Sequence, residues 1–451
     1  MKKTSLFILD IVSLYLSLYF TLFIRYGSNF GSKLDIHLLP FSIIFIFWVF
    51  AFYISNLYDF SSLKNGVIFY SRLFQTIAIN LVTSLAFFYL IPFFIITPKR
   101  NLIIFTLVFS GIDFLVRNIF NRLILSQTFR KNTIIVGLNQ QSLELARFIK
   151  ENPQLGYGLS YIVDISKEGS SDELTEFGII RESNLEKIIA EEKVNTVILS
   201  PAAYQLPRII DTLYKYLDKR INFFNLSDFY EHSTGKIPLG AINQAWFLEN
   251  LTEGTKKPYE LARRVLDIIF SSILGAITLF FLPLLAALIK TTSTGPIFYR
   301  QKRVGQYGKL FEIIKLRTMK KDAEKQSGAV WAQQDDPRVT KLGKFLRKTR
   351  LDELPQLWNI LRGEMSFVGP RAERPEFHEN LKKNIPFYEE RYLIRPGLSG
   401  WAQVQYRYGA SMKDAEEKLQ YDLFYIKNRS IALDISIILK TINIVFRQAG
   451  R

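Results

Sequence analysis

The sequence predicts a membrane protein that combines an α-helical part with an α/β part. Its 451 residues are 48% hydrophobic, and the mean hydropathy is positive, at +0.09. Apolar stretches long enough for membrane helices occupy residues 1–125 and recur at 258–290. Between them, residues 131–250 alternate strand patterns with helical patterns, as in a parallel α/β sheet. We therefore expect four transmembrane helices, a Rossmann-like domain, and a second membrane segment followed by a C-terminal domain at 291–451.

The four expected transmembrane helices are apolar runs of about 17–23 residues. Each is long enough to cross a hydrocarbon core of ~30 Å at ~1.5 Å per residue. Lysines before the first run and basic residues after the last place both ends of the bundle in the cytoplasm. The runs are Ser5–Ile24, Leu38–Ile54, Phe74–Ile96 and Leu102–Phe120.

Three charged residues lie in or near these runs: Asp10, Asp113 and Arg117. A charge in a membrane helix is costly, so such residues often mark functional sites. We expect pairing inside the bundle, or side chains that reach to the interface, to account for them instead.

Residues 131–250 carry the Rossmann-like pattern. Thr133–Gly137 reads as a buried strand that ends in glycine, and a helical pattern follows at Ser142–Lys150. Further strand patterns occur at Tyr161–Asp164 and Val194–Ser200. The glycine-rich dinucleotide fingerprint is missing after Gly137. A regulatory or oligomerisation module therefore fits this domain better than a nucleotide-binding one.

The second membrane segment, residues 258–290, contains Pro283 in its interior. Basic residues flank both of its ends, which places both ends on the cytoplasmic side and indicates a re-entrant helical hairpin. A single crossing is equally consistent with the length and composition. Proline removes one helical hydrogen bond and bends the helix, so Pro283 is the expected break.

The most distinctive stretch of the C-terminal domain is Leu351–Asn359, in which Asp352 and Glu353 stand just before Pro355. Proline favours the first turn of a helix, so we expect the acidic pair at a helix entrance. The preceding residues 291–350 hold 15 Lys or Arg against 5 Asp or Glu. An acidic pair in a basic pocket suits chemistry on phosphate. Taken alone, such a pair is more often a helix cap.

Composition excludes several classes of site. Cysteine is absent and only three histidines occur, which rules out thiol nucleophiles and disfavours histidine-rich metal sites. The net charge of +17, together with apolar spans, favours anionic lipid surfaces and phosphorylated ligands over nucleic acid.

Residues 258–446 resemble the bacterial sugar transferase family, the polyprenyl-phosphate sugar-1-phosphate transferases that begin exopolysaccharide, capsule and O-antigen synthesis. Several independent motifs carry this resemblance. They are Thr294–Gln301, Arg303–Gly305, Lys315–Met319, Asp336–Thr340, Leu351–Gln356, Val368–Arg371 and Arg395–Gln403. The N-terminal half resembles the long form of the same family.

The resemblance implies transfer of sugar-1-phosphate from a UDP-sugar to undecaprenyl phosphate, with release of UMP and ping-pong kinetics. Asp352 would be the nucleophile, and with Glu353 it would hold Mg²⁺. The implied phosphate ligands are Lys315, Arg317, Arg338, Arg347, Arg371 and Arg407. The sequence departs from the family pattern beside Arg407, because Gln405 and Tyr406 precede it where many members have Asn-Gly.

The resemblance also implies a mainly helical catalytic domain, and it favours the re-entrant hairpin with its break at Pro283. The protein would be a multi-pass protein of the bacterial inner membrane, with the catalytic domain on the cytoplasmic face. We further expect a homodimer formed through the N-terminal half. Neither the sugar nor the polysaccharide pathway is identified.

Two other functions fit parts of the sequence. A membrane-anchored nucleotide-sugar dehydratase or epimerase shares the layout, but it needs the missing glycine fingerprint and a Tyr-x-x-x-Lys pair. A membrane scaffold for assembly partners would not need Asp352 or its basic surroundings.

Overall fold

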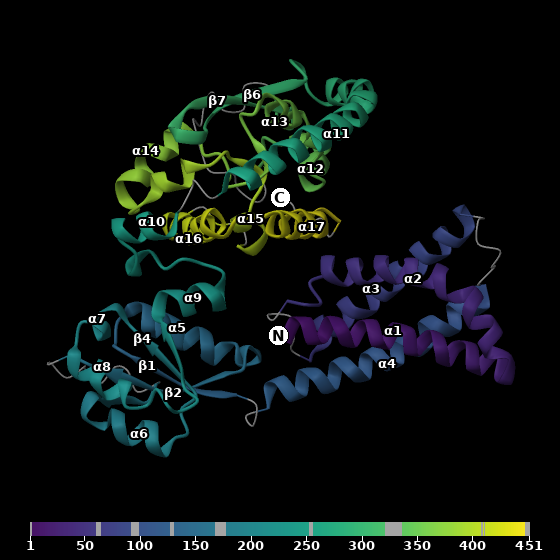
Figure 1. Ribbon diagram of the computed structural model, residues 1–451. Coiled ribbons are helices and arrows are strands. Elements are labelled where there is room, and N and C mark those ends of the chain that lie inside the picture. The colour runs from purple at the N-terminus through teal and green to yellow at the C-terminus, as the bar shows by residue number, and fades with distance from the viewer. Residues whose placement is uncertain are drawn as a thin grey trace. The chain divides into compact units, whose positions relative to one another are not determined.

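The computed structural model divides into two compact units, Met1–Leu226 and Ser227–Arg451, shown together in Figure 1. Each unit has its own core. The structure describes residues 2–59, 65–91, 99–126, 130–166, 177–251, 256–320, 336–406, 409 and 411–446.

Four long helices begin the first unit, and the four predicted apolar runs fall on one helix each. They are α1 (Lys2–Tyr26), α2 (Phe30–Ile54), α3 (Val67–Leu90) and α4 (Lys99–Leu125). The last residues of the third run, 92–96, lie outside the described part. α1 and α3 each pack against α2 and α4. Large aromatic side chains fill the interior, and apolar side chains also cover the outside, as expected of a bundle with lipid around it.

These helices are long and apolar enough to cross a membrane. The candidate spans in the first unit are Thr4–Ile54, Val67–Leu90 and Arg100–Leu125. The first comprises α1 and α2, which turn back on each other at Gly27–Asn29, so its 51 residues suffice for two crossings.

The charged residues of the bundle pair inside it, as expected. The Arg117 guanidinium lies 2.5 Å from Asp10 and 3.0 Å from Asp113, and all three side chains are fully buried. Arg117 also donates to the Leu57 carbonyl oxygen at 3.2 Å. The three residues thereby join α1 and α4 to the turn that follows α2.

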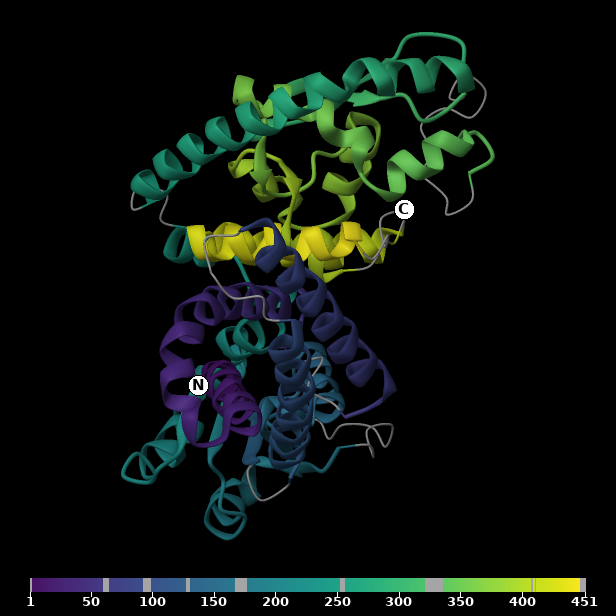
Figure 2. The same ribbon diagram turned by 90° about the vertical axis from the view of Figure 1, so that its right-hand side faces the viewer.

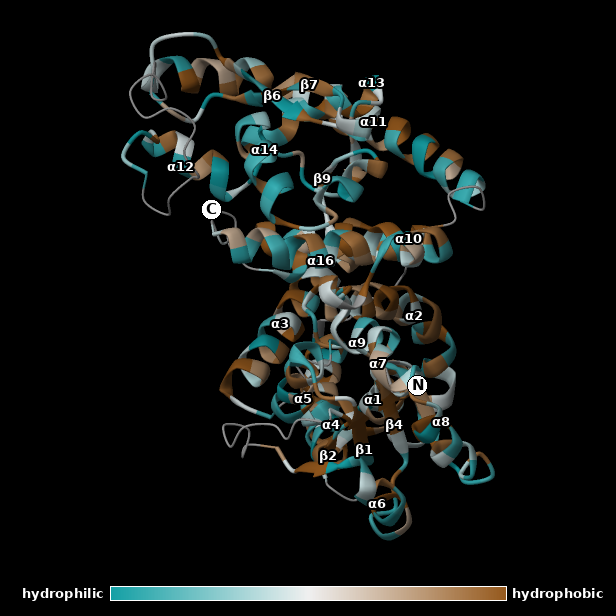
Figure 3. Ribbon diagram, turned by 90° about the vertical axis from the view of Figure 1, so that its left-hand side faces the viewer, coloured by the Kyte–Doolittle hydropathy of each residue, from teal (hydrophilic) through white to brown (hydrophobic). Residues whose placement is uncertain are grey.

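The rest of the first unit is the predicted α/β domain with a parallel sheet. Its five strands lie in the order β3-β2-β1-β4-β5, and all neighbouring strands are parallel. Figure 3 shows the strongly hydrophobic central strands β1 and β4. The strands are β1 (Lys131–Val136), β2 (Tyr157–Asp164), β3 (Ile179–Arg181), β4 (Thr196–Leu199) and β5 (Asn222–Asn225), and the helices are α5 (Gln140–Glu151), α6 (Leu185–Glu191), α7 (Pro201–Tyr204) and α8 (Pro207–Tyr214).

The geometry of the turn after β1 explains why Gly137 occupies it. Gly137 has φ +104°, and a Cβ there would lie 1.8 Å from Ser200 Oγ. α5 then begins with a capping box in which Asn139 and Ser142 bond each other's backbone N–H groups. The first glycine of a Rossmann turn is thus present, while polar capping replaces the later ones.

The second unit begins before the segment that resembles the sugar transferases. Residues 227–250, which the sequence assigned to the Rossmann-like domain, belong to this unit, so that boundary is corrected. Ile237 and Leu239 share a core with Tyr425 and Ile426. Trp401 Nε1 donates to the Gly235 carbonyl oxygen at 2.9 Å. Contacts across more than 160 residues of chain leave no local trace in sequence periodicity.

Helices and two small sheets make up the second unit. The hairpin β6–β7 is antiparallel and the pair β8–β9 is parallel. The strands are β6 (Phe298–Val304), β7 (Leu310–Leu316), β8 (Ser366–Val368) and β9 (Gly397–Ser399). The helices are α9 (Leu226–Thr234), α10 (Gln244–Asn250), α11 (Lys257–Thr292), α12 (Lys341–Lys348), α13 (Leu357–Arg362), α14 (Pro375–Asn384), α15 (Trp401–Gln405), α16 (Met412–Asn428) and α17 (Ile431–Phe446), with 3-10 turns η10 (Leu351–Gln356) and η11 (Tyr388–Leu393).

The predicted hairpin at 258–290 is wrong as secondary structure. α11 is one continuous helix of 36 residues that runs through Pro283, as Figure 2 shows along the top of the view. One missing N–H costs a single hydrogen bond, and a long helix can absorb that by bending. α11 is also a candidate membrane span.

Both ends of α11 contact the same domain. Near its start, Arg264 binds carbonyl oxygens of α13, and near its end Ile289 packs with Leu316 and Leu346. Apolar side chains along the other side of the helix are exposed, among them Ile269, Ile273, Ile277, Phe280 and Leu284.

Candidate active site

The acidic pair lies in a 3-10 turn rather than at the start of an α-helix. Arg350 adopts a left-handed conformation (φ +55°) and ends the preceding turn. η10 follows with Pro355 inside it, and α13 begins only at Leu357. Asp352 and Glu353 are each 7% exposed. The sequence therefore located a helical entrance correctly but assigned it the wrong type of helix.

Three cations surround Glu353, and we call Lys315, Arg350 and Arg371 the cationic cluster. Lys315 Nζ lies 2.8 Å and Arg371 Nη2 2.9 Å from Glu353 Oε1. Arg350 Nη1 lies 3.4 Å from Oε2. Burial acts to raise the pKa of Glu353, but the cationic cluster outweighs burial and holds this pKa well below its ordinary value. Glu353 is therefore a fixed anion.

Asp352 has the opposite character. Among the described residues, no hydrogen bond or ion pair engages its carboxylate. Burial, and then the negative charge of Glu353, raise the pKa of Asp352 to about 6, although Lys315, Arg347 and Arg371 act to lower it. At neutral pH the group is mostly ionised, buried and unpaired, which is the condition of a carboxylate that can attack or bind an electrophile.

One more of the predicted basic residues, Arg347, is held close to the pair. Arg347, on α12, donates from Nε to Thr318 Oγ1 at 2.9 Å, and its charge acts on Asp352. Burial lowers the pKa of Arg347 and of Lys315, so both cations lack full solvation. An anionic substrate group would replace that missing solvation.

The other predicted phosphate ligands have different surroundings. Arg338 forms an ion pair with Asp336, with Nη2 2.7 Å from Oδ2. Arg317 donates to the Thr294 carbonyl oxygen at 3.0 Å, and its guanidinium covers Gly295. A Cβ on Gly295 would lie 2.0 Å from Arg317 Nη1, which explains this glycine. Arg407 lies outside the described residues.

Sequence reasoning missed Arg350 and Asn359 as parts of the site. Arg350 is the last of the 15 basic residues counted in 291–350, but the sequence did not identify it as a partner of Glu353. Asn359 bridges α13 to β7, because its Nδ2 donates to the Glu312 carbonyl oxygen at 2.7 Å and its Oδ1 accepts from the Ile314 N–H at 3.3 Å. Its place in the motif that carries the acidic pair was the available signal.

The acidic pair could donate to a divalent cation, most directly through Asp352, whose carboxylate has no partner among the described residues. Both oxygens of Glu353 already lie beside cations. Among the residues that the structure describes, no group of three or more His, Asp or Glu side chains is placed to hold a metal ion. A metal here would therefore take Asp352 from the protein and its remaining ligands from the substrate and water.

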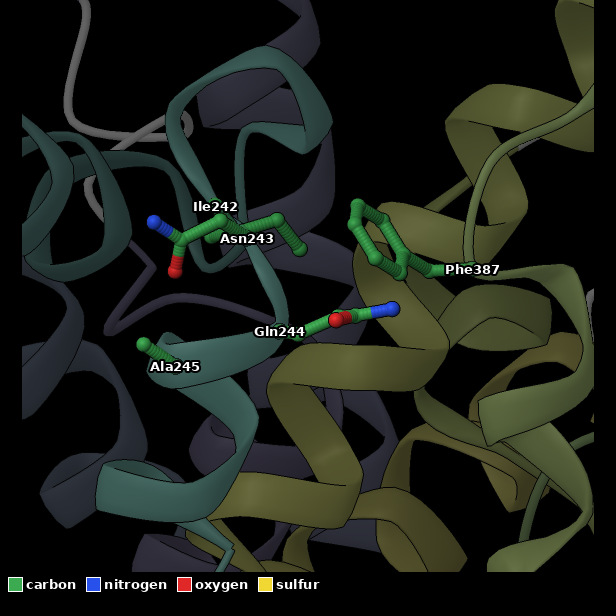
Figure 4. Close-up of a pocket in the computed structure, with 5 residues that line it drawn as sticks. All are labelled: Ile242, Asn243, Gln244, Ala245 and Phe387. Atoms are coloured by element: carbon green, nitrogen blue, oxygen red, sulfur yellow. The ribbon is translucent and has the colours of Figure 1, made fainter.

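The described residues also form a shallow pocket of about 500 Å³ in the same unit, and neither the acidic pair nor the cationic cluster lines it. Figure 4 shows its lining at the start of α10 and beside η11, namely Ile242, Asn243, Gln244, Ala245 and Phe387. These side chains carry no charge, so the pocket offers no group for phosphate chemistry.

Comparison with known proteins agrees with the motifs. A family model described as bacterial sugar transferase matches residues 258–448. A putative undecaprenyl-phosphate N-acetylgalactosaminyl 1-phosphate transferase of Bacillus subtilis is 52% identical over 141 residues, 31% of this chain and 78% of that protein.

Two longer relatives extend the comparison. The UDP-N-acetylgalactosamine-undecaprenyl-phosphate N-acetylgalactosaminephosphotransferase of Aeromonas hydrophila is 40% identical over 234 residues, 51% of this chain and about half (53%) of that protein. The UDP-glucose:undecaprenyl-phosphate glucose-1-phosphate transferase of Xanthomonas campestris pv. campestris is 29% identical over 354 residues, 72% of this chain and 69% of that protein. This chain belongs to the bacterial sugar transferase family.

Proposed function

We propose that this protein transfers sugar-1-phosphate from a UDP-sugar to undecaprenyl phosphate, releasing UMP, as the first membrane step of a surface polysaccharide. The observation that carries the proposal is the unpaired carboxylate of Asp352 beside the cationic cluster. The activities named for the relatives point to the same reaction.

The proposed chemistry runs in two displacements at one carboxylate. An Asp352 oxygen attacks the β-phosphorus of the UDP-sugar, the bond from that phosphorus to the bridging oxygen breaks, and UMP leaves with the bond's electrons. A phosphate oxygen of undecaprenyl phosphate then attacks the same phosphorus and regenerates the Asp352 carboxylate. Lys315, Arg347 and Arg371 stabilise negative charge on the phosphoryl oxygens in both steps.

Glu353 holds those cations rather than a metal in this proposal. With its carboxylate absent, Lys315 and Arg371 would repel each other and move apart. The expected Mg²⁺ would be held by Asp352 and the diphosphate, and when bound it would neutralise phosphate charge.

The contacts at the two ends of α11 support a proposal for its place in the membrane. Because both ends contact the same domain, a straight crossing would draw that domain into the bilayer. We propose that α11 lies in the cytoplasmic leaflet as one continuous helix, with its exposed apolar side towards the lipid chains. The N-terminal bundle then spans the inner membrane, and the acidic pair faces the cytosol, where nucleotide sugars are made. A homodimer remains a prediction.

The relatives' names include two donor sugars, N-acetylgalactosamine and glucose, so their UDP derivatives are tested first. Purified protein in lipid nanodiscs receives Mg²⁺, undecaprenyl phosphate and each UDP-sugar, and UMP release is measured. Asp352→Asn should abolish release, whereas Asp218→Asn, an exposed match, should not. A well-folded wild-type protein that releases no nucleotide from any donor would refute the proposal. A scaffold would keep its function in the Asp352→Asn variant.

A further inference from the structure

α11 presents buried charges to the domain although most of its other side is apolar and exposed. Arg263 is 5% and Asp267 3% exposed, whereas Leu266 and Ile268, next to them in sequence, are exposed. Burying two charges on a membrane-seeking helix is costly unless they are well bonded. Their bonds therefore indicate what they do.

Arg263 and Asp267 hold β8. Asp267 Oδ1 accepts hydrogen bonds from Ser366 Oγ at 3.0 Å and from the Phe367 N–H at 3.1 Å. Arg263 Nε donates to Ser366 Oγ at 2.9 Å, and its Nη2 donates to the Val368 carbonyl oxygen. β8 pairs with β9 as a two-stranded sheet. α11 therefore supplies polar partners to backbone groups of β8 that the sheet does not pair.

β8 leads directly to Arg371. The intervening chain is tightly fixed, because the Gly369 N–H donates to the Ser399 carbonyl oxygen at 2.8 Å and the Gly397 N–H donates to that of Pro370 at 2.9 Å. A Cβ on Gly369 would lie 2.5 Å from the Arg395 carbonyl oxygen, so the backbones are in close contact. A shift of β8 is therefore transmitted to Arg371, whose guanidinium binds Glu353 beside Asp352.

Arg264 holds the other side of the acidic pair. Its Nη1 and Nη2 donate to the carbonyl oxygens of Ile360 and Leu361 at 2.6 and 2.7 Å. Both carbonyl groups belong to the last turn of α13, where the helix leaves carbonyl groups without i+4 partners, and Ile360 also accepts from the N–H of Gly363 at 2.9 Å. α13 follows η10 directly, so Arg264 fixes the helix that carries the acidic pair.

We propose that Arg263, Arg264 and Asp267 are positioning residues, through which the membrane helix sets the distance between Arg371 and the acidic pair. One helix binds both elements that flank the site, β8 and α13. The inference rests on the proposed function for its effect on catalysis. Correct packing of α11 against β8 and α13 is thereby required for phosphosugar transfer, in addition to the role of α11 in attaching the domain to the membrane.

A double-mutant cycle in the full-length protein separates positioning from plain stabilisation. A misplacement of about 1 Å can cost on the order of 100-fold in rate, so Asp267→Ala should lower kcat/KM about 10- to 100-fold, mainly in kcat. Asp267→Asn keeps an acceptor oxygen and should restore activity to within about threefold. In protein that already carries Arg371→Ala, adding Asp267→Ala should lower kcat/KM by less than about twofold, because the effects of coupled residues are not additive. An undiminished loss in that background would overturn the proposal.

Hydrogen–deuterium exchange tests the same inference without catalysis. Asp267→Ala should speed exchange about tenfold or more at residues 366–371 and leave 131–164 unchanged. Ser271→Ala is the matched control, since Ser271 is buried one turn further on and its hydroxyl bonds only within α11 among the described residues. Unchanged exchange at 366–371 would overturn the inference. Absent wild-type transfer with faster exchange would instead refute the proposed function alone.

Discussion

Asp352→Asn should make the protein more stable while it abolishes activity. The folded state raises the pKa of Asp352 from an ordinary value of 3.8 to about 6, so it holds the ionised carboxylate at a cost. At about 1.4 kcal/mol per pKa unit, that cost approaches about 3 kcal/mol above pH 7. Asparagine has nearly the same shape and no charge, so Asp352→Asn should raise the free energy of unfolding by much of this cost.

The stability gained by Asp352→Asn should increase with pH. Below pH 3.8 the carboxyl is protonated in both the folded and the unfolded state, and the substitution gains nothing. Between pH 3.8 and about 6 the unfolded state ionises while the folded state stays protonated, so the gain grows to about 1.5 kcal/mol at pH 5 and levels off above pH 6.

Thermal or denaturant unfolding of the wild type and Asp352→Asn in the same lipid, at pH 4, 5 and 8, measures this gain. Glu353→Gln is the adjacent control of opposite sign, because the pKa of Glu353 is depressed and the ionised group stabilises the fold. Glu353→Gln should cost about 3–5 kcal/mol at pH 8, since it leaves the buried cationic cluster uncompensated. A destabilised Asp352→Asn protein, or a gain that does not change with pH, would refute the reasoning.

Three further predictions follow from single contacts. Wild-type kcat/KM should fall as the pH drops below about 6, as Asp352 is protonated; a flat pH–rate profile from pH 5 to 8 would contradict this. Gly295→Ala should lower the free energy of unfolding by roughly 1–3 kcal/mol, because φ is +126° there, and should displace Arg317, because the added Cβ would lie 2.0 Å from Arg317 Nη1; an unchanged free energy of unfolding would contradict this. Arg117→Met should destabilise the bundle by about 3–5 kcal/mol in thermal unfolding, because Asp10 and Asp113 lose their partner, whereas exposed Leu107→Met should be neutral.

The sequence predicted the elements whose signals are local. The apolar runs of α1–α4 and the strands of the parallel sheet follow from periodicity, and the acidic pair stands out beside its basic surroundings. The ion pair of Arg338 with Asp336, two residues away, could also have been expected.

Long-range contacts lay beyond sequence reasoning. The ion pairs of Glu353 could not be read from the sequence, because its partners Lys315 and Arg371 are 38 residues before it and 18 after it. Pro283 suggested a break because proline removes a helical hydrogen bond, and the sequence does not show whether the surrounding structure keeps the helix continuous. The role of Arg263 and Asp267 becomes visible only once β8 lies beside them.

The attachment of residues 227–251 to the last helices has a consequence for synthesis on the ribosome. Glu231 bonds Lys427, which is 196 residues later in the chain. At about 5–20 residues per second, Glu231 waits roughly 10–40 s for its partner. During that interval Ile237 and Leu239, which end up in the core with α16, have no part of that helix to cover them. The nascent chain therefore exposes apolar side chains at the start of its second unit until translation is almost finished.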